Sequence, residues 1–333
     1  MRTTDLFPDL QLETLHYPIA PAVQQETIAL WRTEWARTDY DWIEALNGDY
    51  SEHLVIATVL ARREGRAVAT ATVHYRRENP DVAVLGSVLT LRAFRGAGLG
   101  GRVVSAAIDE AVAAGCAVCL LGTARNPRNV YLKHGFNWLH GTAMSRDLRP
   151  DEAAEKRFFP GQQTRIRVAN WGDLPGLALL AMQPLATRCF DYPRGLFSGR
   201  YLPAERCLSN FPVLWSETVT KGGSLLVVEG AVGGRILGFG SVTPNAGVGR
   251  RHVSTLDFVV HDSQLDRQAA LVGTLLEAAR AAGAQRANAW VLAADEGKRS
   301  CLLAAGFGEA ARFLSAVRLT AGAEAVVVLE RAL

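Results

Sequence analysis

The order of hydrophobic and polar residues predicts strands that alternate with amphipathic helices. In the first half, residues 54–62 and 67–75 form two apolar strands separated by a short segment with Gly65, the pattern of a β-hairpin. A third strand, residues 82–91, runs into a glycine loop, and a helical pattern begins directly after it. The sequence therefore predicts an α/β fold with a mixed sheet, in which antiparallel strands precede a β-α-β crossover.

The helix after the glycine loop is amphipathic. Small or apolar residues recur with a helical period at Leu99, Val103, Ala107, Ile108, Ala111 and Val112. The polar residues Arg102, Ser105, Asp109 and Glu110 fall on the other side. Glycines leave backbone N–H groups unshielded at such a turn, and the helix N-terminus adds a partial positive charge. The loop is therefore suited to binding a phosphate or pyrophosphate.

Further elements complete the first half. The pattern predicts an extended run at 10–16, a helix over 23–45, a buried strand over 117–121 and closing strands over 136–148. Between the last two, Asn126 is placed to cap a short helix with Pro127 in its first turn and Gly135 just past its end.

Two nucleotide-binding patterns can be weighed against this loop. Gly96-x-Gly98-x-x-Gly101 fits the Rossmann pattern by letter, but that pattern needs an acidic residue at the end of the next strand. Here the strand 117–121 is followed by Gly-Thr-Ala. No Gly-Lys-Ser/Thr occurs in the chain, which excludes a P-loop.

A third interpretation of the glycine loop also explains a second motif further along the chain. Arg95-x-x-Gly98-x-Gly100 after a strand, followed by Tyr131-x-x-x-Gly135-Phe136, resembles the GNAT acyltransferase superfamily. The resemblance implies that acyl-CoA is the co-substrate, that loop amides hold its pyrophosphate and that the preceding strand pairs with its pantetheine arm. The binding residues it implies are Val88, Leu89, Thr90, Arg95, Gly96, Ala97, Gly98, Leu99, Gly100, Gly101 and Asn126.

Acyl transfer to an amine needs a proton for the departing thiolate, and the resemblance points to Tyr131 as the general acid. A phenol with a pKa of about 10 is protonated at neutral pH. The family's Asn seven residues before this Tyr is replaced by Ala124, with Asn126 and Asn129 nearby. The general base stays open. The candidates are His74, His134, Glu34, Asp41 and Glu44, or ordered water.

The second half repeats the first weakly. After a charged linker at 149–163, strands are predicted at 224–230, 235–242 and 253–260, and a helix at 265–282. Aligning the two Ala-Ala-Gly segments at Gly115 and Gly283 gives an offset of 168, which places Asp266 where Gly98 stands. We expect a catalytic domain at 1–148 and, at 164–333, a degenerate GNAT-like domain that forms a wall of the acceptor pocket.

This tandem architecture resembles mycothiol synthase and the N-acyltransferases of glycopeptide-antibiotic assembly. The leading hypothesis is an acyl-CoA-dependent N-acyltransferase for a small or medium-sized amine, such as an aminosugar of a secondary metabolite. An aminoglycoside resistance acetyltransferase is an alternative, because acidic residues are frequent between positions 34 and 52. A non-catalytic CoA-binding sensor or scaffold is another.

Composition and charge narrow the classes of partner that the chain is expected to bind. The chain of 333 residues is 49 % hydrophobic and 21 % charged, as in soluble globular proteins, and its net charge of +3 does not favour nucleic acid. No signal core or apolar run of membrane-spanning length is apparent, which favours a cytoplasmic location. We expect no metal: the histidines lack metal-ligand spacing, and Cys116 and Cys119 are expected to point to opposite faces of a strand.

Overall fold

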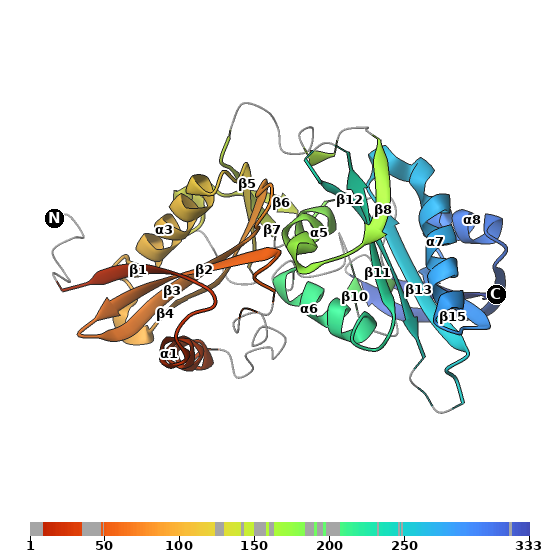
Figure 1. Ribbon diagram of the computed structural model, residues 1–333, viewed down its shortest axis with the longest axis horizontal. Helices are drawn as coiled ribbons and strands as arrows, with labels where there is room; N and C mark the ends of the chain where they lie inside the picture. Colours follow the sequence, from red (N-terminus) through yellow and green to blue (C-terminus); the bar gives the residue numbers. More distant parts are fainter. Residues whose placement is uncertain are drawn as a thin grey trace. The chain divides into compact units, whose positions relative to one another are not determined.

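The computed structural model divides the chain into two compact units, each described by itself below (Figure 1). Unit 1 is Met1–Ala154 with Asn170–Leu179 and Pro203–Ser209, and unit 2 holds the remainder. The described residues are 9–34, 48, 50–123, 130–140, 143–149, 158–159, 163–183, 190–191, 196–197, 207–231, 233–245, 247, 249–319 and 322–333. Every helix within these ranges is too short or too polar to span a bilayer.

Unit 1 contains one mixed sheet of seven described strands in the order β1-β2-β3-β4-β5-β7-β6. All neighbouring strands are antiparallel except β4 and β5, which are parallel and joined through a helix. The strands are β1 (Gln11–His16), β2 (Leu54–Arg63), β3 (Arg66–Arg76), β4 (Val82–Thr90), β5 (Val118–Gly122), β6 (Asn137–His140) and β7 (Ala143–Asp147). The helices are α1 (Pro21–Arg32) and α3 (Leu99–Ala113).

The expected hairpin is confirmed, because β2 and β3 are joined by a two-residue turn at Glu64 and Gly65. Both residues have positive φ (51° and 76°), as a tight turn between twisted strands requires. The helix expected over 23–45 is shorter, since α1 ends at Arg32, and the positions 35–47 lie outside the described residues.

The two helices cover opposite faces of the sheet. Helix α3 buries Leu99, Val103 and Ile108 against alternate residues of β2, β3 and β4. Val112 was expected on this buried stripe, but it is 50 % exposed because it lies one residue beyond the stripe in the last turn. Val104, which was not expected there, is fully buried. Helix α1 packs Leu30 on the other face.

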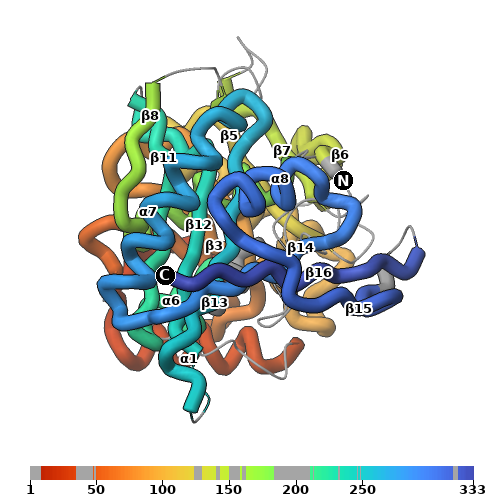
Figure 2. The backbone as a smooth tube through the Cα atoms, turned by 90° about the vertical axis from the view of Figure 1, so that its right-hand side faces the viewer, coloured from red at the N-terminus to blue at the C-terminus, as the bar shows by residue number. Residues whose placement is uncertain are grey.

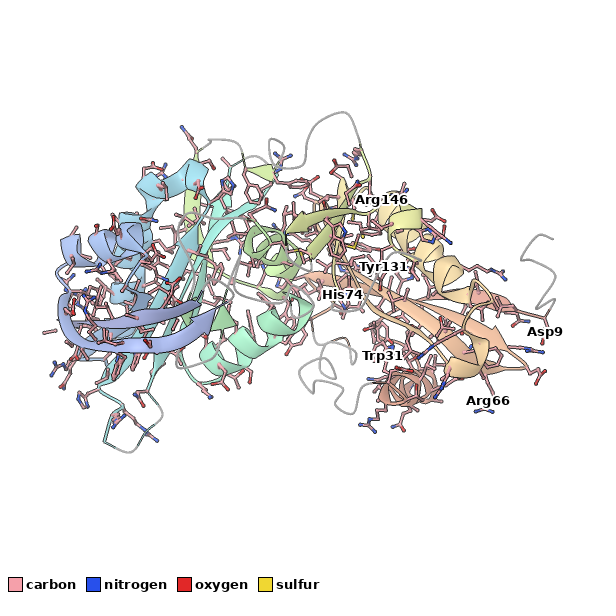
Figure 3. The ribbon with its side chains drawn as sticks, turned by 180° about the vertical axis from the view of Figure 1, so that it is seen from behind. Asp9, Trp31, Arg66, His74, Tyr131 and Arg146 are labelled. Atoms are coloured by element: carbon pink, nitrogen blue, oxygen red, sulfur yellow. The ribbon has the colours of Figure 1, made fainter. Side chains whose placement is uncertain are left out.

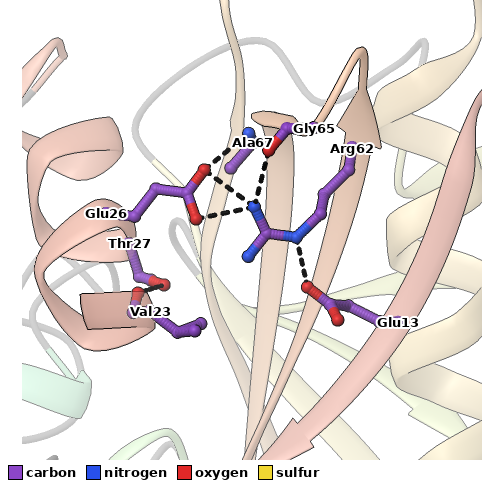
Figure 4. A network of polar contacts seen from close by, with 7 residues as sticks. All are labelled: Glu13, Val23, Glu26, Thr27, Arg62, Gly65 and Ala67. Carbon is purple, nitrogen blue, oxygen red and sulfur yellow. Dashed lines mark hydrogen bonds and ion pairs between the residues drawn. The ribbon is translucent and has the colours of Figure 1, made fainter. Parts of the chain in front are cut away.

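An ion-pair network fixes α1 to the sheet (Figure 4). Arg62 on β2 binds both carboxylate oxygens of Glu26 on α1, at 2.8 and 2.6 Å, and also pairs with Glu13 on β1. The backbone N–H of Ala67 donates to Glu26 as well. Burial alone would raise the pKa of Glu26, but these hydrogen bonds and the charge of Arg62 hold it below its ordinary value.

A short segment from the second half of the chain belongs to unit 1. Asn170 caps a 3-10 turn, η4 (Trp171–Asp173), in which the Trp171 ring stacks on Tyr50 with ring centroids 3.7 Å apart. A Cβ on Gly172 would meet the carbonyl of His53 at 2.9 Å. Unit 1 is therefore completed by residues well beyond position 148.

Unit 2 repeats the topology with a second mixed sheet, in the order β8-β11-β12-β13-β14-β16-β15. Its strands are β8 (Thr164–Val168), β11 (Ser224–Gly230), β12 (Ile236–Pro244), β13 (Val253–Val260), β14 (Arg286–Leu292), β15 (Gly308–Leu319) and β16 (Gly322–Ala332). Helix α7 (Gln268–Ala281) lies across β11 and β12 (Figure 2). The described part also contains the strands β9 (Phe190–Asp191) and β10 (Leu196–Phe197) and the helices α5 (Leu174–Ala181), α6 (Cys207–Thr218) and α8 (Glu296–Ala304).

The predicted repeat is confirmed at the level of topology, with one correction at the loop. Leu91 and His261 each end a strand and donate a backbone N–H to the neighbouring hairpin strand, at 2.9 and 2.8 Å. Gly115 lies 24 residues after Leu91, whereas Gly283 lies 22 residues after His261. The single offset of 168 is therefore wrong across the loop, which is two residues shorter in unit 2. A 3-10 turn, η7 (Asp262–Arg267), fills it, so α7 begins at Gln268 rather than at Leu265.

The two neighbouring cysteines lie in the same core rather than on opposite faces. Cys116 precedes β5, so the alternation of a strand does not apply to it, and both thiols pack in the cluster under α3. Burial, with Asp81 nearby, raises the pKa of Cys116 to about 12, and burial raises that of Cys119. Within the described ranges no group of His, Cys, Asp or Glu residues could hold a metal ion.

We predict that unit 2 depends on the carboxylate of Glu229 on β11, which is 2 % exposed and binds Arg165 and Arg167 of β8, each at 2.7 Å. Burial alone would raise its pKa, but the two arginines lower it to about 2. Glu229→Gln should lower the free energy of unfolding of unit 2 by about 1.5–3 kcal/mol at pH 7.

Because the folded-state pKa of Glu229 is depressed, this stabilisation is present above the unfolded-state pKa of about 4.3 and is lost as the pH falls toward about 2. Hydrogen exchange of the β8 and β11 amides in urea measures it at pH 7, 5 and 3. The matched control is Glu217→Gln, which removes an exposed pair with Lys221 and should cost less than about 0.5 kcal/mol. An equal effect of both variants, or one independent of pH, would contradict the prediction.

Candidate functional site

The site begins where β4 and β5 part. The two parallel strands pair only at Val82–Val118, Ala83–Cys119 and Val84–Leu120. Beyond Val84 no further β4–β5 pairs occur among the described residues, although β4 continues to Thr90. The backbone groups on that edge of β4 are therefore left for another extended partner.

A bulge in β4 lies next to this opening. The β3–β4 register is Thr72 with Gly86 but Thr70 with Leu89, so β4 has one extra residue between these pairs. Ser87 has a φ of +50° there, which turns the strand. The sequence analysis missed this bulge, although the Gly-Ser dipeptide within an otherwise apolar strand was a signal for it.

The glycine loop follows a single 3-10 turn, η2 (Arg92–Phe94). Gly96 and Gly98 have φ values of +85° and +80°, so the loop uses the left-handed conformation that glycine adopts without strain. Gly98 is the N-cap of α3, and its carbonyl accepts the first helical hydrogen bond from Arg102 N–H at 3.2 Å. The first turn contains no acidic residue, and no side chain caps it. Its N–H groups can therefore bind an anion.

Three segments converge on the start of α3. A Cβ on Gly100 would lie 3.3 Å from Thr90 Oγ1 at the end of β4. A Cβ on Gly101 would lie 3.2 Å from His134 Nε2 of η3 (Leu132–His134). Side chains at these two positions would fill the space between strand, helix and η3. Glycine at these two positions therefore lets the start of α3 pack closely against Thr90 and His134.

The side chain of Arg95 is turned away from the amides of the loop. Its Nε donates to the Thr90 carbonyl at 2.9 Å, and its terminal nitrogen pairs with Glu34 beyond the end of α1. Glu34, expected among the candidate bases, is therefore held by an arginine. This pair links the helix α1 side of unit 1 to the start of the loop.

The expected binding residues differ in whether their side chains can reach a ligand. Leu89 and Leu99 are 4 % and 1 % exposed and pack in the core, so only their backbone groups can face a ligand. Val88 is partly buried against the core under α3. Asn126 lies outside the described residues, as do the candidate bases Asp41 and Glu44.

Tyr131 precedes η3, so it stands at the start of a single turn rather than in the middle of a helix. Its ring meets Phe136 edge to face, with centroids 6.1 Å apart, and packs against the core under α3. Burial raises the pKa of Tyr131 to about 12. The value of about 10 expected from the sequence is therefore too low, and the phenol stays protonated at neutral pH.

Neither histidine candidate has the properties of a strong base. His74 on β3 is 4 % exposed, and burial lowers its pKa to about 4, so protonating it is costly. Its Nδ1 lies 3.3 Å from the Val84 carbonyl. Burial, together with Arg146, lowers the pKa of His134, which faces Gly101 at the anion cradle. Figure 3 labels Tyr131, His74 and Arg146.

Comparison with known proteins agrees with this geometry. Residues 16–136 match the model of the acetyltransferase (GNAT) family. No curated protein matches the sequence.

Several solved structures align with about half of this chain. A ribosomal-protein-alanine N-acetyltransferase from Brucella melitensis is 20 % identical with a TM-score of 0.42, over 51 % of this chain and 99 % of that one. A GCN5-related N-acetyltransferase from Kribbella flavida is 20 % identical with a TM-score of 0.42, over 51 % and 98 %. A GNAT acetyltransferase from Streptococcus pneumoniae is 18 % identical with a TM-score of 0.40, over 51 % and 100 %. The family match assigns the segment 16–136, which lies within unit 1, to the acetyltransferase (GNAT) family.

Proposed function

We propose that unit 1 transfers an acyl group from acyl-CoA to the amine of a small or medium-sized acceptor. The observation that carries this proposal is the open edge of β4 leading directly into an uncapped, acid-free helix N-terminus. The edge offers backbone hydrogen bonds to an extended pantetheine arm. The amides from Gly96 to Gly101 offer donors and the positive end of the helix dipole to the pyrophosphate, whereas Arg95 N–H already donates to the Arg92 carbonyl at 3.3 Å.

The proposed reaction gives a direct chemical role to one side chain, that of Tyr131. The amine nitrogen attacks the thioester carbonyl carbon, and the carbon–sulfur bond breaks. Tyr131 gives its phenolic proton to the departing thiolate, and the amine loses a proton to ordered water. Water is favoured over the candidate bases within the described residues because His74 is held neutral, His134 faces the anion cradle and Glu34 is paired with Arg95, and the candidates Asp41 and Glu44 lie outside those residues.

We further propose that the catalytic domain is built on residues 1–148 and the degenerate domain on 164–333, joined by the linker at 149–163, although the segment Asn170–Leu179 packs in unit 1. Three features support the loss of CoA binding in unit 2. Its loop lacks the left-handed glycines, and Asp262 stands in the first turn of η7. The strand β13 pairs with β12 without a bulge. A role for unit 2 as a wall of the acceptor pocket stays a prediction.

The third feature that supports the loss of CoA binding in unit 2 is a buried ion pair. It involves β13, at the position equivalent to the bulge in β4. Val82 and Val253 hold the same position in their sheets, so Asp257, four residues on, corresponds to Gly86. Asp257 pairs with Lys298 of α8, which is fully buried and lies 5.1 Å from the Phe258 ring centroid. The side chain that replaces a glycine here is therefore committed to an internal contact.

The charge of the acceptor amine is open. The alternative of a polycationic aminoglycoside depended on six acidic residues between 34 and 52, of which Glu34 pairs with Arg95, while Asp39, Asp41, Glu44 and Asp49 lie outside the described residues. Thiol release from acetyl-CoA and longer acyl-CoAs should be measured against glucosamine, kanamycin and simple alkyl amines. Faster turnover with kanamycin than with glucosamine would favour the resistance enzyme, and binding of acetyl-CoA without turnover of any amine would favour a sensor or scaffold.

The loop assignment is tested by a matched pair of variants at Gly98. Gly98→Asn and Gly98→Asp place side chains of similar size in the same left-handed conformation, which both residues tolerate better than most. They differ in charge, so Asp should weaken acetyl-CoA binding at least about tenfold more than Asn. Calorimetry measures both affinities, and similar values for the two variants would contradict an anion site at this turn.

The general-acid assignment predicts that Tyr131→Phe lowers kcat by about 10²–10⁴-fold, with little change in acetyl-CoA affinity. The phenol acts only as the thiolate departs, so its loss affects the transition state alone. The matched control is Tyr75→Phe, which removes a 2.8 Å hydrogen bond to Glu110 without touching the cradle. Single-turnover rates that stay within about twofold of wild type for Tyr131→Phe would make another group or water the acid.

We predict one CoA site per chain. Calorimetric titration of the full chain with CoA should give a stoichiometry near one, and Gly98→Asp should abolish that binding. The full chain is needed because Trp171 and Gly172 pack in unit 1. Two sites, or one site that survives Gly98→Asp, would show that unit 2 binds CoA.

A further inference from the structure

We propose that Arg146 of β7 is a positioning residue, which holds the turn that carries Tyr131 in its reactive place. This inference rests on the general-acid role proposed for Tyr131. Arg146 is half-buried, and its Nε and Cδ lie 3.7 and 3.8 Å from the point where a Cβ on Gly135 would be. The guanidinium stem therefore packs along the left-handed glycine that ends η3.

That glycine closes the turn through the backbone of Tyr131 itself. Gly135 has a φ of +78°, and its N–H donates to the Leu132 carbonyl at 3.1 Å. The Tyr131 carbonyl accepts two hydrogen bonds, from His134 N–H at 2.9 Å and from Phe136 N–H at 3.2 Å. This is the pattern in which a left-handed glycine terminates a helical turn. A shift of Gly135 would therefore move the backbone from which the phenol projects.

Unit 2 contains the same device without the tyrosine. Cys119 pairs with Arg146 in the first sheet, and the corresponding Ala287 pairs with Arg331 in the second. Arg331 lies 3.6 Å from the Cβ position of Gly306, whose φ is +84°, and donates to the Ala305 carbonyl.

Two of the backbone hydrogen bonds that close the turns also match. Phe307 N–H donates to the Leu302 carbonyl at 3.1 Å, and Gly306 N–H donates to Leu303 at 2.9 Å, whereas Ala305 N–H donates to Cys301 at 3.0 Å. Leu302 therefore takes the place of Tyr131 in a similar turn, which ends α8. An arginine therefore lies beside the turn in both units. Only the turn in unit 1 carries the proposed general acid, Tyr131.

The position of the arginine has a physical reason. The last carbonyls of a helical turn carry partial negative charge, which a cation beside them stabilises. The pKa of Tyr131 is raised by burial alone, so the charge of Arg146 does not set the acidity of the phenol. Arg146 consequently acts on the placement of the phenol. Displacement of a catalytic group by about 1 Å can cost about 10²-fold in rate.

The test is a double-mutant cycle on the full chain, with thiol release from acetyl-CoA measured with the best amine of the panel and with water alone. Arg146→Met should lower kcat about 10–100-fold and leave the KM for acetyl-CoA within about twofold. In the Tyr131→Phe background the same substitution should change kcat less than about threefold, because the group that it positions is gone. Arg146→Lys keeps the stem and charge and should restore part of the rate.

Arg331→Met is the matched control, because it removes the equivalent arginine, and its hydrogen bond to the Ala305 carbonyl, from the turn that carries Leu302. It should lower the thermal midpoint as Arg146→Met does, with kcat unchanged. Equal losses of kcat in both backgrounds, or from both arginine variants, would reduce Arg146 to a structural residue and overturn the proposal. A raised KM with unchanged kcat would make it a cofactor contact instead. If Tyr131→Phe itself leaves kcat unchanged, the general-acid role fails first and the positioning role with it.

Discussion

The structure of unit 1 depends on the point at which two parallel strands stop pairing. β4 and β5 share three residue pairs and then part, and the bulge at Ser87 turns β4 at that place. Backbone groups that no longer meet a neighbouring strand need another partner, because unpaired polar groups are costly once water is excluded. The glycine loop and the first turn of α3 continue this row of unpaired donors. The site is thus a continuous backbone surface, and few of its side chains take part.

The comparison of the two units shows which features would remove such a surface while the fold persists, as we propose for unit 2. The sheet order and the alternation of buried residues depend on apolar side chains, which unit 2 retains. The open surface depends on small residues at a few positions. Where β4 has Gly86, β13 has Asp257 with its ion pair to Lys298, and where the first loop has left-handed glycines, the second has a shorter 3-10 turn. On the proposal that unit 2 does not bind CoA, substituting a few glycines and shortening one loop would be enough to separate the fold from its ligand chemistry.

Much of this could be predicted from the sequence because it depends on local periodicity. The strands 224–230 and 253–260, the hairpin turn at Glu64 and Gly65 and the start of α3 follow from alternation, turn chemistry and a glycine N-cap. The remaining features depend on contacts between distant residues. The bulge at Ser87 is defined by the register against β3, and the pairing of Glu34 with Arg95 joins positions 61 residues apart. The binding roles assigned to individual loop residues stay predictions, as do the domain boundaries.

The burial of Tyr131 changes how its chemistry must be understood. A phenol with a pKa of about 12 is a weaker acid than the free side chain, so intrinsic acidity cannot be what selects it. Desolvation also raises the pKa of a thiolate formed beside it, which reduces the mismatch between donor and acceptor. In the general-acid role that we propose for Tyr131, what the protein controls is the distance and direction of the proton transfer. A rigid turn, closed by the left-handed Gly135 and flanked by Arg146, provides that control through the backbone. In such a dry site the geometry of the turn matters more for the rate than the acidity of the group it carries.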